Sequence, residues 1–74
     1  MRTTFDTARA EALFASPLPS PGQPSTDEIR KAVTSTLLAL GLRGCADRVA
    51  AEFDDHPETA ARRLRWATAT ISRM

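Results

Sequence analysis

Side chains that commonly carry out catalysis are scarce in this sequence. Among its 74 residues there is one histidine, His56, one cysteine, Cys45, and no tyrosine. Nucleophilic catalysis needs a nucleophile beside a base, and these residues offer no such pair. A lone cysteine and a lone histidine also cannot build a metal site. The sequence therefore indicates a protein that is not an enzyme and that holds no metal or cofactor.

Three carboxylates, those of Asp54, Asp55 and Glu58, surround His56 and could suggest a metal site. Aspartates are also typical of turns, and acidic residues stabilise the first turn of a helix by opposing its dipole. Pro57 is favoured at the first position of a helix, where its missing N–H has no helical partner. A turn followed by a helix, with Asp55 or His56 as its cap, explains the cluster better than a metal ion does.

Positive charge is concentrated near the end of the chain. Residues 56–74 contain four arginines against one glutamate, a balance of +3, although the net charge of the whole chain is only +1. At about 100° per residue, a helix over residues 57–72 presents a narrow polar ridge formed by Glu58, Arg62, Arg65 and Arg73. Arginines on such a ridge can bind phosphates or guanine edges. The ridge could equally be a solvated helix face.

The flank beside this ridge carries Thr59, Arg63, Trp66 and Thr70. Arg63 lies nearest the core edge of the flank, and Trp66 lies nearest the ridge. Because Trp66 follows Arg62 by four residues, its ring can stack on that guanidinium. Two other roles remain open for Trp66, since it can complete the edge of the core or anchor a protein partner.

Two helices joined by a tight turn must position these side chains. Apolar residues at four-residue intervals predict a helix over residues 45–53, with Cys45 in the core as a small hydrophobic side chain. This stripe consists of Cys45, Val49 and Phe53. The turn is expected at Asp54, Asp55 and His56. The second helix has an apolar stripe of Ala60, Leu64, Ala67 and Ile71. Helix, short turn and helix form the layout of a helix-turn-helix unit.

The same stretch resembles the helix-turn-helix signature of many bacterial regulators. The residues that carry the likeness are Val49, Ala50, Phe53, His56, Pro57, Glu58, Thr59 and Ala60. Asp54 stands where such units usually have glycine, and Asp55 stands where they have an apolar residue. The wider pattern also resembles short uncharacterised actinobacterial proteins, a likeness that adds no chemistry.

The resemblance implies a small DNA-binding protein, a transcriptional regulator that uses the helix over residues 57–72 as its recognition helix. The side chains expected at the DNA are Glu58, Thr59, Arg62 and Arg65 in the major groove, and Arg63 and Arg73 on phosphates. Double-stranded DNA is therefore the expected partner. One such unit makes few base contacts, so specific binding would need a homodimer or a larger protein partner.

A further helix of the same domain is predicted over residues 26–40. Ser25 and Glu28 have the spacing of a capping box, in which each side chain binds the backbone N–H of the other residue. Gly41 is placed to end this helix in the left-handed conformation, which glycine adopts easily. The apolar stripe of this helix comprises Ile29, Val33, Thr36, Leu37 and Leu40.

Residues 1–24 are expected to precede the folded domain and to be largely dispensable for its folding. Residues 16–24 contain four prolines, which exclude helix and sheet and predict an exposed, semi-rigid linker. Residues 1–15 leave two alternatives, a mostly flexible tail or a short helix from about residue 6. In the second case Phe5, Leu13 and Phe14 would dock on the domain or on a partner.

These features together predict an all-α fold, a three-helix bundle of residues 25–74 that contains the helix-turn-helix. A chain of this length buries only about 60% of its unfolded surface, which leaves little room for a substrate pocket. No apolar run approaches the ~20 residues that cross a membrane, and the lone cysteine suits a reducing, cytoplasmic setting. The alternative function is a helical adaptor that binds another regulator or RNA polymerase. Its partner surface would comprise Trp66, Phe5, Leu13 and Phe14.

Overall fold

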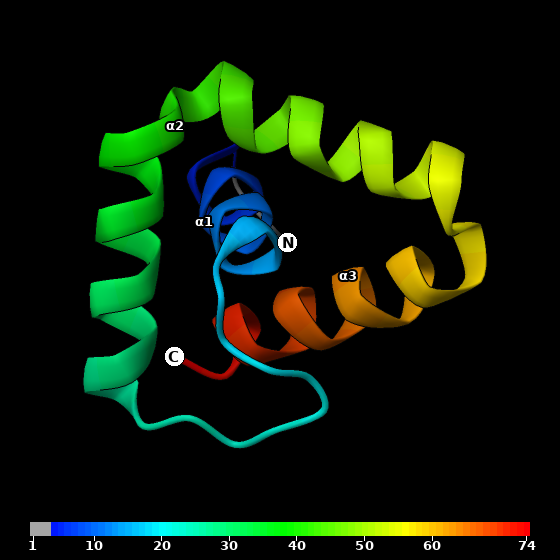
Figure 1. The fold of residues 1–74 in the computed structure, drawn as a ribbon. Coiled ribbons are helices and arrows are strands. Elements are labelled where there is room, and N and C mark those ends of the chain that lie inside the picture. Colours follow the sequence, from blue (N-terminus) through cyan, green and yellow to red (C-terminus); the bar gives the residue numbers. More distant parts are fainter. Residues whose placement is uncertain (1–3) are drawn as a thin grey trace.

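The computed structural model of the protein describes residues 4–74, which fold into three helices and contain no β-strand (Figure 1). Helix α1 spans Thr4–Ala15, α2 spans Thr26–Asp55, and α3 spans Pro57–Ser72. An extended linker of residues 16–25 joins α1 to α2. The predicted all-α, three-helix fold is therefore confirmed. None of these helices combines the length and the apolar character that a membrane span requires.

Helix α2 begins at the predicted capping box. The Ser25 hydroxyl accepts a hydrogen bond from the Glu28 backbone N–H at 3.1 Å, and a Glu28 carboxylate oxygen accepts one from the Ser25 N–H at 2.8 Å. Both donors would otherwise have no partner inside the helix, so the box fixes the point at which the linker ends.

A kink at Gly41 divides α2 into two halves that point in different directions (Figure 1). Gly41 has a φ of 73° and a ψ of 172°, a conformation that is essentially restricted to glycine. The halves match the two helices predicted over residues 26–40 and 45–53. The expected gap between them is wrong, because helical structure resumes directly after Gly41 and continues to Asp55. One residue with positive φ is enough to redirect the chain.

The connection between α2 and α3 is shorter than the three-residue turn that the sequence predicts. Asp54 and Asp55 belong to the last turn of α2, and only His56, with a φ of −142° and a ψ of 67°, is non-helical. The backbone N–H of His56 donates to the Glu52 carbonyl at 2.7 Å, which extends α2 to the very start of α3. Pro57 opens α3 as predicted, but no side chain of His56 or Asp55 caps it.

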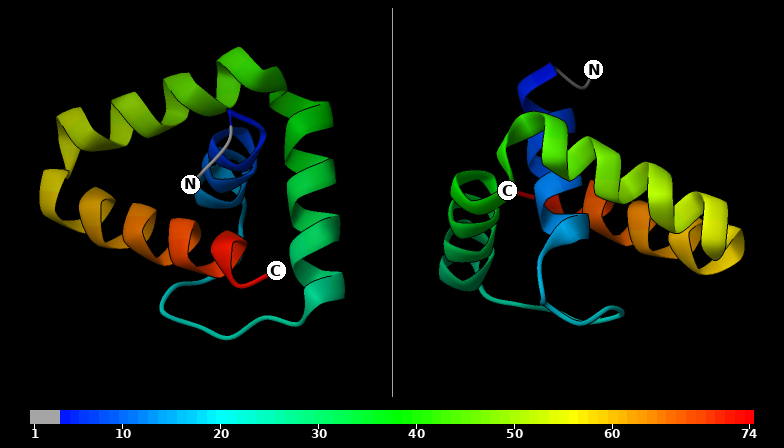
Figure 2. Two further views of the ribbon diagram at one scale, coloured as in Figure 1. Left: turned by 180° about the vertical axis from the view of Figure 1, so that it is seen from behind. Right: turned by 45° about the horizontal axis from the view of Figure 1, so that its top comes forward.

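Helix α1 lies at the centre of the molecule. Figure 1 shows it nearly end-on, with the two halves of α2 and helix α3 arranged around it, and Figure 2 shows the same enclosure from behind. Its residues Ala10, Ala12, Leu13 and Phe14 are buried. Of the two alternatives for residues 1–15, the structure has the docked helix over residues 4–15, and residues 1–3 lie outside the described part of the chain. The helices of residues 25–74 share one core with α1, because they enclose it from three sides.

The core combines small and large apolar side chains from all three helices. Its buried members are Ala10, Ala12, Leu13, Phe14, Ile29, Val33, Cys45, Ala60, Ala67 and Ile71. Burial of Cys45 confirms its predicted place in the core, and burial raises the pKa of its thiol, with the charge of Glu11 acting in the same direction and Arg48 opposing it. Leu40 is wrong as a core residue, since it lies next to the kink at Gly41 and is 37% exposed.

Candidate nucleic-acid interface

The predicted ridge of α3 is exposed along its whole length. Glu58, Arg62, Arg65 and Arg73 are all classed among the exposed residues, and Thr59 is exposed beside them. The ridge points outward because the opposite side of α3 places Ala60, Ala67 and Ile71 in the core and leaves Leu64 half-buried. The apolar stripe predicted for this helix is thus confirmed, and it fixes which arginines face solvent.

Arg62 and Arg65 keep their charges free of ion pairs. Within residues 4–74 the recorded salt bridge joins Arg9 to Asp6, on a different helix. Arg73 makes only a long contact of 3.5 Å with the Thr70 hydroxyl. The ridge therefore presents guanidinium groups that can take an anionic ligand without first breaking an internal salt bridge.

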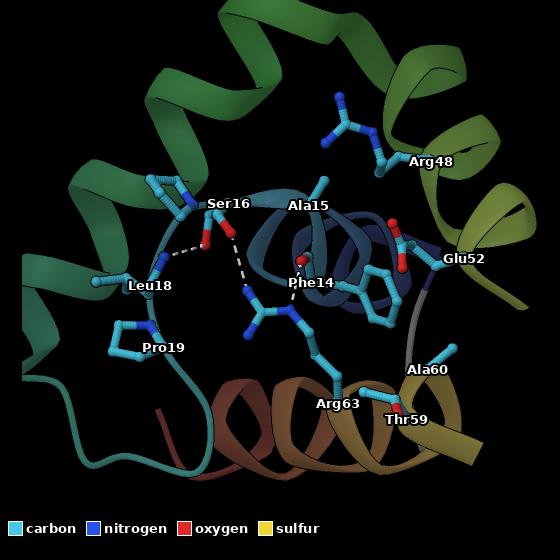
Figure 3. Close-up of a pocket in the computed structure, with 11 residues that line it drawn as sticks. Phe14, Ala15, Ser16, Leu18, Pro19, Arg48, Glu52, Thr59, Ala60 and Arg63 are labelled. Atoms are coloured by element: carbon cyan, nitrogen blue, oxygen red, sulfur yellow. Dashed lines mark hydrogen bonds between the residues drawn. The ribbon is translucent and has the colours of Figure 1, made fainter. Parts of the chain in front are cut away.

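Arg63 has a different task from the one that the resemblance implies. Its guanidinium leaves α3 and reaches the carboxyl end of α1, where it donates to the backbone carbonyls of Phe14 at 2.7 Å and of Ser16 at 2.8 Å (Figure 3). It also donates to the Ser20 hydroxyl at 2.9 Å and, at 3.4 Å, to the carbonyl of Leu13. The Leu13 carbonyl also accepts from the Ser16 N–H at 3.2 Å. The carbonyls at a helix end otherwise lack a helical N–H partner, so Arg63 serves as a cap of α1. The same bonds occupy the guanidinium that was expected on a phosphate.

Two aromatic rings complete the surroundings of Arg63. Its guanidinium carbon lies 5.1 Å from the centre of the Trp66 ring and 5.8 Å from that of Phe14. Both distances are within the range of cation–π attraction. Burial lowers the pKa of Arg63, while the negative charge of Glu52 acts in the opposite direction. An arginine keeps its proton under such conditions, so a positive charge is held at the carboxyl end of α1.

Trp66 stacks on Arg63, and not on Arg62, the stacking partner that the sequence allowed. The indole N–H of Trp66 donates to the Gly22 carbonyl at 2.9 Å, which ties the linker to α3. The ring is half-buried and packs against the core. Of the roles left open for Trp66, the structure places the ring at the edge of the core, with the linker as its intramolecular partner.

The other side chains considered for partner contact are divided by the fold. Leu13 and Phe14 lie inside the core, where they contact the protein's own helices. Phe5 is 67% exposed at the beginning of α1. Only Phe5 of this set is therefore open to another molecule.

A cleft of about 390 Å³ lies where α1, the linker, the second half of α2 and α3 meet (Figure 3). Its polar lining consists of Ser16, Arg48, Glu52, Thr59 and Arg63. Cys45 and His56 do not line it. No group of three or more His, Cys, Asp or Glu side chains among residues 4–74 could hold a metal ion. The lining offers binding groups for a polar ligand.

Sequence reasoning missed the Arg63–linker junction for a physical reason. The acceptors of Arg63 lie 43 to 50 residues earlier in the chain, and they are mainly backbone carbonyls. Such acceptors exist at every residue, so no residue type marks them. The position of Arg63 at the core edge of its flank was the one available signal.

Comparisons with known proteins add no family to this picture. No protein-family model, no curated protein and no solved structure matches the chain. The helix-turn-helix resemblance therefore stands on the residues that carry it.

Proposed function

We propose that this protein binds double-stranded DNA through the exposed ridge of α3 and acts as a small transcriptional regulator. The proposal rests on one observation. Within residues 4–74, Arg62 and Arg65 present guanidinium groups without ion pairs on one exposed helix face. Arg73 extends the same face by two further turns. Binding of phosphates by arginine supplies most of the affinity of a non-specific DNA complex, and bidentate contacts to guanine add specificity.

Charge along the ridge favours one orientation of α3 on DNA. Asp54, Asp55 and Glu58 are exposed around the amino-terminal end of the helix, where they repel phosphates. Arg62, Arg65 and Arg73 follow on the exposed face. We therefore expect contacts from Arg62 onward to dominate, with Thr59 at the boundary and Glu58 restricted to a base edge that can donate a hydrogen bond.

The connection at His56 affects how deeply α3 can enter a groove of DNA, because it keeps α3 next to α2. Figure 1 shows α3 turning back beneath the second half of α2, and the linker runs along the flank that holds Arg63 and Trp66. The ridge is the side of α3 that neither α2 nor the linker covers. Three arginines on one protomer give few contacts, so a homodimer that doubles them is part of the proposal.

Fluorescence anisotropy with a labelled duplex of mixed sequence tests this proposal. Starting at about 50 mM salt, the log–log plot of affinity against salt should have a slope near −3 for one protomer, since each phosphate contact contributes about −0.9. A dimer should double the slope to about −6. Arg62→Ala and Arg65→Ala should each weaken binding. The cost should be about 1–3 kcal/mol for an arginine that reads a guanine.

Arg43→Ala is the matched control, because Arg43 is an exposed arginine on α2 away from the ridge. Circular dichroism should show that all three variants keep their helices. Absence of duplex binding at about 50 mM salt, where phosphate contacts are strong, would reject the proposal. Equal losses for Arg43→Ala and Arg62→Ala would reject the ridge as the binding surface.

A second candidate function, the helical adaptor, is supported by exposed apolar side chains away from α3. Leu38 is 83% exposed, Phe5 is 67% exposed and Leu42 is 65% exposed. Large exposed apolar side chains that form a patch often mark protein interfaces. If the protein is an adaptor, purified RNA polymerase should retain the parent and release the Leu38→Gln/Leu42→Gln double variant. Retention of both, or of neither, would count against this function.

A further inference from the structure

A groove opens on the face opposite to the viewer of Figure 1. The left view of Figure 2 shows its surroundings, with the beginning of α1 between the first half of α2 and the end of α3. The groove has a volume of about 620 Å³, within the range of small-molecule sites in proteins. It is separate from the Arg63 cleft, and none of the ridge arginines lines it.

The floor of this groove is apolar and narrow. Ile29, Val33 and Ile71 line it while being only 5%, 7% and 5% exposed. Leu37 continues the floor, and Phe5 and Met74 are exposed at its margin. A row of bulky side chains from a docked helix would find little area on such a floor. A single chain of methylene groups is thinner and could lie along it.

Positive charge borders the apolar floor, and no aspartate or glutamate lines the groove. Arg30 is exposed and has no ion pair among the described residues. Arg9 is paired with Asp6 at 2.6 Å and lies 4.6 Å from the centre of the Phe5 ring. Among the side chains at the groove, Asp6 compensates Arg9, and Arg30 is left as an uncompensated positive charge. This balance suits a monoanion better than a dianion such as a phosphate monoester.

One buried donor in this region has no acceptor. The Nε of Arg9 is covered by protein atoms and makes no hydrogen bond within the described part of the chain. Buried donors in proteins are nearly always hydrogen-bonded. Phe5 packs over this guanidinium and is itself largely exposed.

We propose that the groove binds an amphiphilic monocarboxylate, with its aliphatic chain on Ile29, Val33 and Ile71 and its carboxylate on Arg30 and Arg9. Arginine suits this task because its N–H groups match the two oxygens of a carboxylate. The apolar chain removes exposed apolar surface at Phe5 and Met74 from water. This inference does not depend on DNA binding, because it uses a different surface.

Titration of the ¹⁵N-labelled protein with decanoate, followed by NMR, tests the proposal at concentrations where decanoate is monomeric. Binding should saturate at one ligand per protein, with the largest shifts at Val33, Leu37 and Ile71. Arg30→Gln should weaken binding by roughly tenfold or more, as expected for loss of a charged hydrogen bond. Thr34→Trp should also weaken it, because Thr34 lines the groove from an exposed position and the indole would fill the space.

Arg43→Gln is the matched control and should bind decanoate like the parent, because Arg43 lies outside the groove. Decyltrimethylammonium has a ten-carbon chain with the opposite charge and should bind more weakly than decanoate. Failure of decanoate to saturate, equal binding of the two amphiphiles, or equal effects of Arg30→Gln and Arg43→Gln would each overturn the proposal. Circular dichroism of Thr34→Trp shows whether weaker binding of decanoate comes from a filled groove or from loss of the fold.

Discussion

Arg63 connects three segments that are distant in the sequence. From α3 it binds the last carbonyls of α1, the Ser20 hydroxyl in the linker and the face of Trp66. Lysine could not make the same set of bonds, because its ammonium is a compact charge without a planar fork of donors. The side chain is therefore a structural junction on the helix that also carries the candidate interface.

Replacement of this arginine should destabilise the protein without removing the ridge. Arg63→Ala removes the donor to the Phe14 and Ser16 carbonyls, and we expect a loss of roughly 2–3 kcal/mol in the free energy of unfolding. Arg63→Lys should recover only part of it. Urea denaturation followed by circular dichroism measures the loss, with Arg62→Ala as an exposed control expected within about 0.5 kcal/mol of the parent. Equal stability of Arg62→Ala and Arg63→Ala would contradict the capping role.

Residues in local contacts were predictable from the sequence, while residues in distant contacts were not. The pair Ser25 and Glu28 is recognisable because its bonds span three residues. The sequence also allowed Trp66 to stack on Arg62, four residues away, but the ring lies against Arg63, three residues away. Both arginines are within reach of the ring on a helix, and the carbonyls of α1 decide between them.

At the scale of elements, helix starts and the kink were predictable, but the connections were not. Pro57 and Ser25 mark their helix starts through chemistry that is independent of the rest of the fold. Gly41 marks the kink. The aspartates at 54 and 55 also favour a turn by residue type, yet the structure keeps them helical. Helix α2 ends at His56 because the following Pro57 disfavours the α-helical conformation at that residue.

Substitution at the kink tests how much the fold depends on one backbone conformation. An alanine Cβ at position 41 would meet no atom within 4 Å, so Gly41→Ala creates strain only in the backbone. We expect a loss of about 1–3 kcal/mol in the free energy of unfolding, the range for residues held in such regions. Thermal and urea denaturation can measure it.

A synthetic chain with D-alanine at position 41 is the matched control for this prediction. The D-residue carries the same methyl group, but a φ of 73° with a ψ of 172° mirrors an extended conformation that L-residues adopt readily. It should therefore restore most of the stability lost in Gly41→Ala. Equal destabilisation by both enantiomers would contradict the assignment of the loss to the backbone conformation.

At the scale of the whole molecule, α1 is the element least evident from the sequence, although the other elements surround it. Helix α1 contributes Ala10 and Ala12 to the core, and small side chains give little periodic signal. The four prolines that follow it suggested a boundary, although the linker they form folds back on α3 through Gly22 and Ser20. The three helices predicted for residues 25–74 do not include α1. Without α1, the space between them would lack the side chains that fill the core.

The central position of α1 leads to a final prediction, opposite to the expectation that residues 1–24 are dispensable. Leu13 is fully buried, so Leu13→Ala should cost about 2–5 kcal/mol, most of the ~5 kcal/mol available to so small a domain. Leu38→Ala, a matched leucine that is 83% exposed, should leave the melting temperature nearly unchanged. A chain of residues 25–74 should show no cooperative melting alone, because its apolar stripes then face water. Addition of a peptide of residues 1–24 should restore helical circular dichroism and a cooperative transition in a concentration-dependent way. If residues 25–74 melt cooperatively without the peptide, α1 covers a domain that is already complete, and its central place contributes little to stability.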